Sequence, residues 1–319
     1  MSLGFVLLAW AFSNMNMKKL LFDIENANFF WVIIAMVCGL ISHLARAVRW
    51  KLLLKPLGYN AAISNSFYAV IIGYFSNYLV PRLGEITRCA TLSKTDNIPI
   101  EKLLGTVFVE RIVDLIITAI ITFLIVFLQF NLIKDFYNSS IQPLLNTSQT
   151  NGINVKIILL VSVVIITLIA YLFREKIKKL KVFKKIKSFA VGFSEGIKSI
   201  LKLQNSLLFI AYSLLIWLMY FATAYFTFFT FQPTSNLSIN AGMMVLFLGT
   251  VSIILPIPGG IGVFHKLVGS GLVLYGVSES DGITYATISH AVQMIMIFFA
   301  GLISMLLIGI KYGSKKSNL

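Results

Sequence analysis

Long apolar runs alternate with short charged or polar segments along most of this chain. Residues 207–231 and 283–310 contain no charged side chain. Since an α-helix rises about 1.5 Å per residue, about 20 apolar residues cross the hydrocarbon core of a bilayer. The pattern therefore predicts about six membrane-spanning helices, the first of them short, at residues 1–12, 29–48, 103–130, 156–173, 207–231 and 283–310.

Two further apolar segments do not fit a simple crossing. Residues 58–80 lie between two basic segments, and residues 241–277 are interrupted by a Pro- and Gly-rich break at 256–262. Because basic segments favour the cytoplasmic side, one crossing in either place would put a basic segment outside. We therefore expect two re-entrant hairpins, the first entering from the cytoplasm and the second from outside; the alternative is an ordinary loop between two short spans.

The expected fold class is an all-α polytopic membrane protein, with about six full spans plus the two re-entrant hairpins in an inverted repeat. Such repeats are typical of transporters, whose broken helices meet near the midplane. We expect one integral membrane domain over residues 1–319, organised as a first half (1–130), an extracytoplasmic loop (131–155), a basic cytoplasmic amphipathic segment (174–205) and a second half (206–312).

Composition and charge support this assignment. The chain is 58% hydrophobic and 12% charged, against about 25% charged residues in soluble domains. Its net charge of +15 raises nucleic-acid binding as an option, but cytoplasmic loops of membrane proteins collect Lys and Arg. We therefore expect no nucleic-acid partner. Residues 174–205 place both termini in the cytoplasm, and we expect a bacterial inner (plasma) membrane protein.

Three charged residues lie inside an otherwise apolar predicted helix: Glu110, Arg111 and Asp114. Each ionised group at mid-helix costs about 2.5–3.5 kcal/mol against lipid, so these side chains must face protein. Glu110 and Asp114 are four residues apart and share one helix face. They either bind or gate a charged substrate, or form an ion-pair clamp with Arg82 or Arg88.

Arg46 and Arg49 lie one turn apart at the predicted cytoplasmic end of a span, beside Trp50. A guanidinium presents a planar fork of donors that suits phosphate, and Trp is a common interfacial anchor. The simpler expectation for Arg49 is a side chain that reaches out to the interface. Both arginines are candidates for contact with a headgroup.

A denser polar cluster follows, in which Pro81 and Gly84 close a hairpin. Its candidate binding residues are Asn77, Arg82, Glu85 and Arg88. Two arginines beside one carboxylate leave a net positive charge that an anionic headgroup could neutralise. We expect Arg82 and Arg88 to meet a phosphate, positioned by the carboxylates and Arg111 of the helix that follows.

The break in the second hairpin contributes the remaining candidates, Pro258, Gly259, Gly260, Gly262 and His265. Irregular backbone at membrane depth is tolerated only inside protein or beside a water-filled cavity. The break therefore predicts a cavity, and His265 either contacts a headgroup or is a hydrogen-bonded structural residue.

Motifs of the common catalytic classes are absent from the sequence. There is no phosphate-binding Gly-x-x-x-x-Gly-Lys-Ser/Thr, no His-Glu-x-x-His and no nucleophile elbow. Cys38 and Cys89 fall in segments of different character, so no disulfide or metal site is expected between them. We expect a protein without cofactor or metal that is not an enzyme.

Four motifs in order resemble one known family. These are Arg46-Ala-Val-Arg49-Trp50-Lys51, Asn77-x-x-x-Pro81-Arg82-x-Gly84-Glu85-x-x-Arg88, Glu110-Arg111-x-x-Asp114 and Pro258-Gly259-Gly260-x-Gly262-Val263. The pattern is similar to the lysylphosphatidylglycerol synthase transmembrane-region family, whose members are regarded as lipid flippases. A carboxylate usually follows the glycine element in that family, where this chain has His265. The chain also lacks the soluble synthase domain of bifunctional relatives.

The resemblance and the buried charges together favour a flippase that moves an anionic phospholipid or a polyprenyl-linked lipid. The alternatives are an accessory enzyme or subunit acting on lipid-linked sugars or headgroups, for which Glu85 and Glu110 are the candidate carboxylates, and a membrane scaffold. The expected partners are membrane lipids with an anionic headgroup or a polyprenyl phosphate, and a homodimer or a partner synthase or glycosyltransferase is compatible with the sequence.

Overall fold

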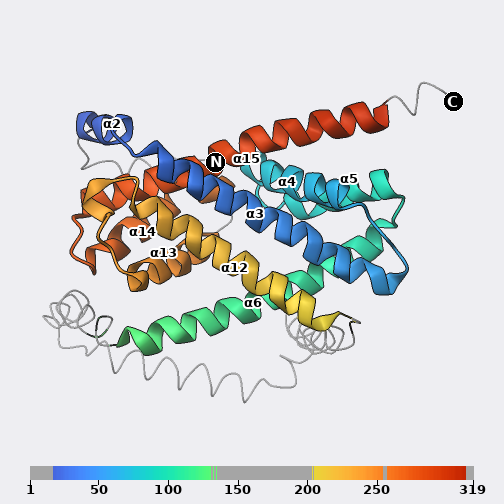
Figure 1. The fold of residues 1–319 in the computed structure, drawn as a ribbon, viewed down its shortest axis with the longest axis horizontal. Coiled ribbons are helices and arrows are strands. Elements are labelled where there is room, and N and C mark those ends of the chain that lie inside the picture. Colours follow the sequence, from blue (N-terminus) through green and yellow to red (C-terminus); the bar gives the residue numbers. More distant parts are fainter. Residues whose placement is uncertain are drawn as a thin grey trace, which may run out of the picture. The chain divides into compact units, whose positions relative to one another are not determined.

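Helices account for all the regular structure in the part of the chain that the computed structural model describes. That part comprises residues 17–130, 132, 134, 203, 205–253 and 257–313. Nearly all of it belongs to one compact unit built from residues 1–125 and 202–319, and the fold below is that of this unit (Figure 1).

Four helices are long and apolar enough to cross a membrane: α3 (Phe29–Leu54), α6 (Ile100–Leu128), α12 (Ser206–Phe228) and α15 (Glu279–Gly313). They confirm four of the predicted spans and the all-helical, multi-pass membrane class. The two other predicted spans, 1–12 and 156–173, lie outside the described residues. So do most of the predicted loop 131–155 and nearly all of the basic segment 174–205.

The outward faces of these helices are strongly apolar. On α6, Phe123 and Phe127 are 68% and 71% exposed, and on α15 Leu306 is 65% exposed. A water-soluble protein would bury such side chains, whereas lipid solvates them. Glu110 and Asp114 of α6 lie instead on its inward face, as their i, i+4 spacing predicts.

The first hairpin consists of α4 (Ile63–Leu79) and α5 (Gly84–Asp96), joined to α3 through the 3₁₀ turn η1 (Lys55–Leu57). Its arms approach closely, because a Cβ on Gly84 would stand only 2.2 Å from the carbonyl oxygen of Gly73. The hairpin is longer than expected: residues 58–80 supply only one arm. The returning arm α5 was expected to be a cytoplasmic segment, because its side chains are polar and basic. In the structure these residues form a helix that packs against the rest of the protein.

The second hairpin consists of α13 (Ile239–Ser252) and α14 (Val263–Val273), two short apolar helices. The predicted break between them contains the 3₁₀ turn η5 (Pro258–Gly260). Gly259, Gly260 and Gly262 all have positive φ, which explains why this turn is made of glycine.

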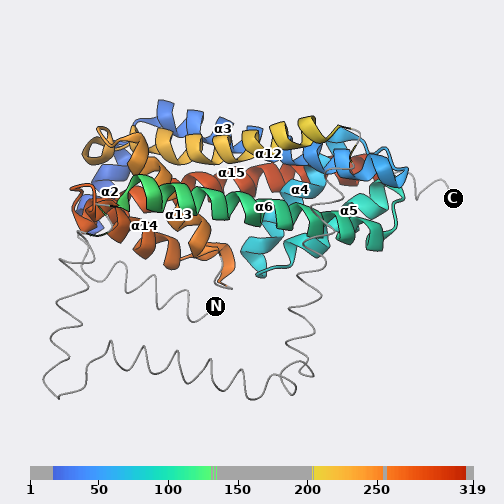
Figure 2. The same ribbon diagram turned by 90° about the horizontal axis from the view of Figure 1, so that it is seen from below.

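The two hairpins pack against α15 from its opposite ends (Figures 1 and 2). At the open end of the first hairpin, Asn65 is hydrogen-bonded to Tyr312 at 2.7 Å and to Lys311 at 3.2 Å. Near the open end of the second, a Cβ on Gly269 would meet Ile283, in the first turns of α15. The order long helix, hairpin, long helix thus occurs twice, with the hairpins running in opposite directions along α15.

The remaining elements fasten the end of the unit where α15 begins. The short helix α2 (Met17–Glu25) is tied to it by an ion pair between Lys19 and Asp281 at 2.6 Å. α3 packs along α12, and the carbonyl oxygen of Thr230, before the 3₁₀ turn η4 (Gln232–Thr234), accepts from the backbone of Asn28 at 2.9 Å. These contacts hold the long helices in a fixed register around the hairpins.

Candidate functional site

The centre of the site is formed by two carboxylates of α6 and two arginines of α3. Asp114 accepts from both arginines, through Oδ2 from Arg46 Nη1 at 2.9 Å and through Oδ1 from Arg49 Nη1 at 2.8 Å. The i, i+3 and i, i+4 spacings place each pair on one helix face, so two helices suffice to bring four charges together. Arg49 and Glu110 are both 0% exposed, which makes this a buried network rather than an interfacial one.

Glu110 connects the first hairpin to this centre. Its Oε2 accepts from Arg88 of α5, and its Oε1 lies 3.4 Å from Arg49 Nε. The expected clamp between α6 and Arg88 is therefore present. A single carboxylate thus faces arginines from two elements, α3 and α5.

Aromatic rings complete the surroundings of the arginines. The Arg88 guanidinium lies over the ring of Trp50, 4.7 Å from its centroid, and Trp50 Nε1 donates to Thr106 Oγ1 of α6 at 2.8 Å. Arg49 lies over Phe209 of α12 at 5.7 Å. Trp50 is fully buried, so its expected role as an interfacial anchor is wrong, as is the expectation that Arg49 reaches out to the interface. Instead, the charge of Arg49 is paired inside the protein with Glu110 and Asp114.

Hydroxyl groups of α12 and α4 extend the network. Ser213 Oγ accepts from Arg49 Nη1 at 3.2 Å, and Tyr220 OH accepts from Arg46 Nη2 at 3.2 Å. Tyr220 OH is in turn 3.2 Å from Tyr74 OH of α4. Ser213 and Tyr220 were not among the predicted site residues; the available signal was that these two hydroxyls are seven residues apart, hence on one face, in a span without charges.

The network, defined as Arg46, Arg49, Arg88, Glu110 and Asp114, contains one more positive than negative charge. All three arginines have buried nitrogens without a hydrogen-bond acceptor: Nε of Arg46, Nε and Nη2 of Arg49, and Nε of Arg88. Glu110 Oε1 has no hydrogen-bond donor either, although it lies 3.4 Å from Arg49 Nε. Buried charges are costly unless they are paired and hydrogen-bonded. The network therefore carries one positive charge that no carboxylate within it balances, and guanidinium groups suit the oxygens of a phosphate.

Other predicted residues lie outside this network. Arg111 is 47% exposed at its side chain and pairs with Glu85 at 2.6 Å, so it does not position Arg82 or Arg88 as expected. Arg82 is exposed in the turn between α4 and α5, with φ of 65°. Asn77 Oδ1 accepts from the backbone N–H of Gly84 at 2.7 Å and closes that turn. These residues shape the tip of the first hairpin.

The glycine break forms a second polar locus, around α14 and α15. His290 Nε2 of α15 lies 2.7 Å from the carbonyl oxygen of Gly259. His265 is buried in the first turn of α14, where its Nδ1 accepts from the backbone of Gly262 at 3.4 Å, and its ring lies 5.1 Å from that of His290. The hydrogen bond from Gly262 supports the expectation that His265 is a hydrogen-bonded structural residue. Pro258 belongs to the 3₁₀ turn.

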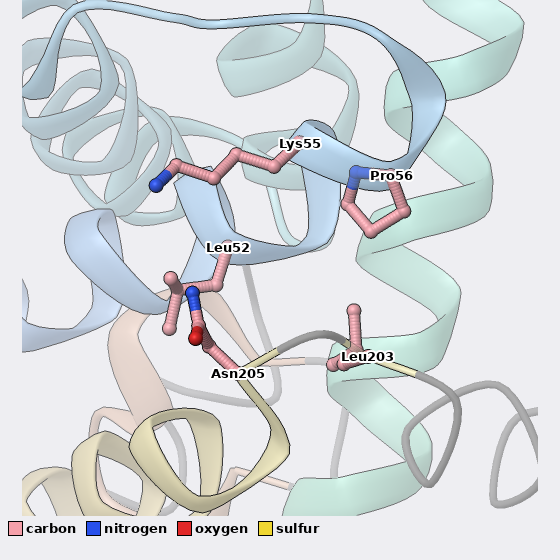
Figure 3. A pocket seen from close by; sticks show the side chains of 5 residues that line it. All are labelled: Leu52, Lys55, Pro56, Leu203 and Asn205. Atoms are coloured by element: carbon pink, nitrogen blue, oxygen red, sulfur yellow. The ribbon is translucent and has the colours of Figure 1, made fainter.

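A small hollow lies elsewhere, where α3 ends and α12 begins (Figure 3). Its lining residues are Leu52, Lys55, Pro56, Leu203 and Asn205. None of the five network residues lines it. The hollow is therefore distinct from the site that carries the buried charge.

Comparison with known proteins agrees with this description. The sequence pattern of the lysylphosphatidylglycerol synthase transmembrane region matches residues 1–301. A UPF0104 membrane protein of Methanocaldococcus jannaschii is 31% identical over 115 residues, which are 35% of this chain and 34% of that relative. The aligned part thus spans about a third of the relative's length. No solved structure matches the chain. The match over residues 1–301 shows that the chain belongs to the lysylphosphatidylglycerol synthase transmembrane-region family, a family of membrane proteins linked to lipid handling.

Proposed function

We propose that this protein moves an anionic lipid, either a phospholipid or a polyprenyl-linked lipid, across the membrane without changing it chemically. The observation that carries the proposal is the excess positive charge of the buried network, in which each arginine has at least one nitrogen without a hydrogen-bond acceptor. A lipid phosphate that enters hydrocarbon loses its hydration, and guanidinium groups can replace much of that lost stabilisation.

Arg88 is the residue through which we expect a phosphate to engage the network. It belongs to a hairpin, and its guanidinium shares Glu110 with Arg49. An incoming phosphate can replace Glu110 at Arg88 while Arg49 continues to balance the carboxylate. Exchanging one anion for another at a guanidinium avoids leaving a bare charge in the interior, which is the expensive step.

The opposed hairpins supply the second part of the proposal. We propose that both are re-entrant in the membrane and form an inverted repeat, with the first open to the cytoplasm and the second to the other side. The order of elements and the opposite directions of the hairpins along α15 support this arrangement. The bacterial inner membrane, cytoplasmic termini and association with a second copy or with a synthase or glycosyltransferase remain part of the same proposal.

Reconstitution tests the proposed transport. Purified protein in vesicles should speed the movement of fluorescent phosphatidylglycerol between leaflets, measured by quenching of the outer leaflet with dithionite. Arg88→Gln should slow this movement about tenfold or more, because it removes a buried charge-assisted donor. Arg111→Gln is the matched control, since that side chain is exposed, and should have little effect.

Two results would contradict the proposal. The first is a rate in protein-containing vesicles no higher than in empty vesicles. The second is a covalently altered lipid, detected by mass spectrometry after incubation with polyprenyl phosphate or phosphatidylglycerol, which would favour the accessory enzyme. Polyprenyl phosphate added as a competitor distinguishes the two lipid classes, because it should slow phosphatidylglycerol movement only if it uses the same site.

A further inference from the structure

The tips of the two hairpins meet at one aromatic side chain. Tyr78, in the last turn of α4, lies against the backbone of Gly259, in the turn between α13 and α14. A Cβ on Gly259 would stand 2.7 Å from Cδ1 and 3.0 Å from Cε1 of the Tyr78 ring. Carbon atoms do not pack this closely, so the ring can lie there only because residue 259 has no side chain.

Gly259 is also contacted by α15. Its carbonyl oxygen lies 2.7 Å from His290 Nε2, and the His290 ring stacks on Phe264 with centroids 5.4 Å apart. Gly259 also has φ of 61°, a backbone conformation that residues other than glycine rarely adopt. The turn is thus contacted both by a histidine of α15 and by a tyrosine ring of α4.

The contact is partly buried and lies where the two hairpins end. Tyr78 packs with Met296 and Ile297, about midway along α15. The open ends of the hairpins lie near the opposite ends of the same helix. A path that follows the first hairpin inward and the second hairpin outward must therefore pass the place where Tyr78 meets Gly259.

We infer that the contact between Tyr78 and Gly259 is the closed barrier of the lipid path, and that the path opens when the two tips part. This inference rests on the proposed transport. The tips meet through van der Waals contact of the Tyr78 ring with the Gly259 backbone, whereas the first hairpin is tied to α6 by the buried ion pair between Arg88 and Glu110. Van der Waals contact between two surfaces is far cheaper to separate than a buried ion pair, so the tips part before the network does.

Alanine substitutions in the turn separate a steric wedge from backbone strain. Gly259→Ala places a methyl group into the Tyr78 ring and should push the tips apart. Gly260→Ala is the matched control, because φ there is 70° but the nearest atom to its Cβ would be Ser252 Oγ at 3.6 Å. Gly276→Ala is a second control, with φ of 82° and nothing within 4 Å.

Hydrogen–deuterium exchange of the segment 257–265, followed by mass spectrometry, reads the contact without reference to transport. Exchange in Gly259→Ala should be about tenfold faster than in Gly260→Ala, because parting the tips exposes backbone amides. Tyr78→Ala should also speed exchange. The double variant Tyr78→Ala/Gly259→Ala should exchange no faster than Tyr78→Ala, since the methyl group then meets no ring.

Lipid movement in vesicles provides the second readout. Gly259→Ala should raise the rate of phosphatidylglycerol movement about tenfold above Gly260→Ala, by the same displacement of the tips. Equal exchange in the two variants, or faster exchange with an unchanged rate of lipid movement, would overturn the inference. If exchange responds as expected but no form of the protein moves lipid, the proposed transport fails and so does the barrier role, while the contact itself stands.

Discussion

The two hairpins pack against the same helix from opposite ends and both contain apolar clusters, but among the described residues only the first also carries a buried ion pair. The first is tied to its neighbours by charge: Arg88 of α5 meets Glu110 of α6 in a fully buried setting. The second is held by shape, through an apolar cluster that includes Phe264, Val268 and Leu272 of α14 with Tyr285 of α15.

This difference bears on what each hairpin can do. A buried ion pair fixes a position strongly, but it can be exchanged for another charged partner. An apolar contact has no such alternative partner, but it can slide or separate at a smaller cost. The first hairpin is therefore suited to binding a charged group, and the second to moving against it at the glycine turn.

The largest expected effect on stability comes from removing the buried ion pair of the first hairpin. Glu110→Gln removes the carboxylate shared by Arg88 and Arg49 and leaves both guanidinium groups in the interior. Removing one partner of a buried ion pair destabilises by about 3–5 kcal/mol. Thermal unfolding in detergent should show this loss. A melting temperature like that of the unsubstituted protein would show that the network does not hold the first hairpin.

A smaller effect compares close helix packing in the two hairpins. In Gly84→Ala the new Cβ would stand 2.2 Å from the backbone oxygen of Gly73, which cannot move without shifting a helix. We expect a loss of about 1–3 kcal/mol. Gly271→Ala is the counterpart, because its Cβ would meet only the end of the Leu248 side chain at 2.1 Å, which can rotate away. Equal losses in the two variants would contradict the packing described here.

One buried hydroxyl group, that of Tyr285, tests how much a polar contact contributes to stability beside the second hairpin. Tyr285 OH donates to the carbonyl oxygen of Ala224 in α12 at 2.6 Å. Tyr285→Phe keeps the ring and removes only this bond, so the expected loss is about 0.5–1.5 kcal/mol. Chemical denaturation in detergent measures it. A loss as large as that of Glu110→Gln would mean that polar contacts, and not apolar ones, dominate at this hairpin.

The smallest effect concerns the exposed pair at the tip of the first hairpin. Arg111 and Glu85 are 47% and 30% exposed at their side chains, so solvent screens their attraction. Glu85→Gln should change stability by less than about 1 kcal/mol. The same thermal assay serves, and the contrast with Glu110→Gln is the informative quantity. A comparable loss would show that burial does not separate the two ion pairs.

The sequence was sufficient to predict the long helices, the glycine break and the buried character of Glu110 and Asp114. The length of an apolar run and the helical spacing of its residues are local properties, so both can be read directly from the sequence. The pairing of charges could not be read in this way. Arg82 and Arg88 lie near each other in sequence, yet only Arg88 reaches the network, because Arg82 is exposed in the turn between α4 and α5 whereas Arg88 is buried on α5.

The returning arm α5 was hidden for a related reason. Its polar side chains, among them Arg88 and Thr91, resemble those of a cytoplasmic segment when they are read one by one. Only the partners on α3 and α6, which are distant in sequence, make such a helix acceptable inside the protein. Tyr220 was missed similarly, because its role in the site depends on Arg46 of α3, which is distant in sequence.

The entry of the two hairpins from opposite faces of the membrane is the central claim of this account, and cysteine labelling tests it most directly. Lys94→Cys marks the open end of the first hairpin and Asn236→Cys that of the second; both positions are exposed. Each is introduced into protein in which Cys38 and Cys89 are replaced by Ala. A membrane-impermeant maleimide applied to right-side-out and inside-out vesicles should label Asn236→Cys only in the former and Lys94→Cys only in the latter. Labelling of both positions from the same face would contradict the account.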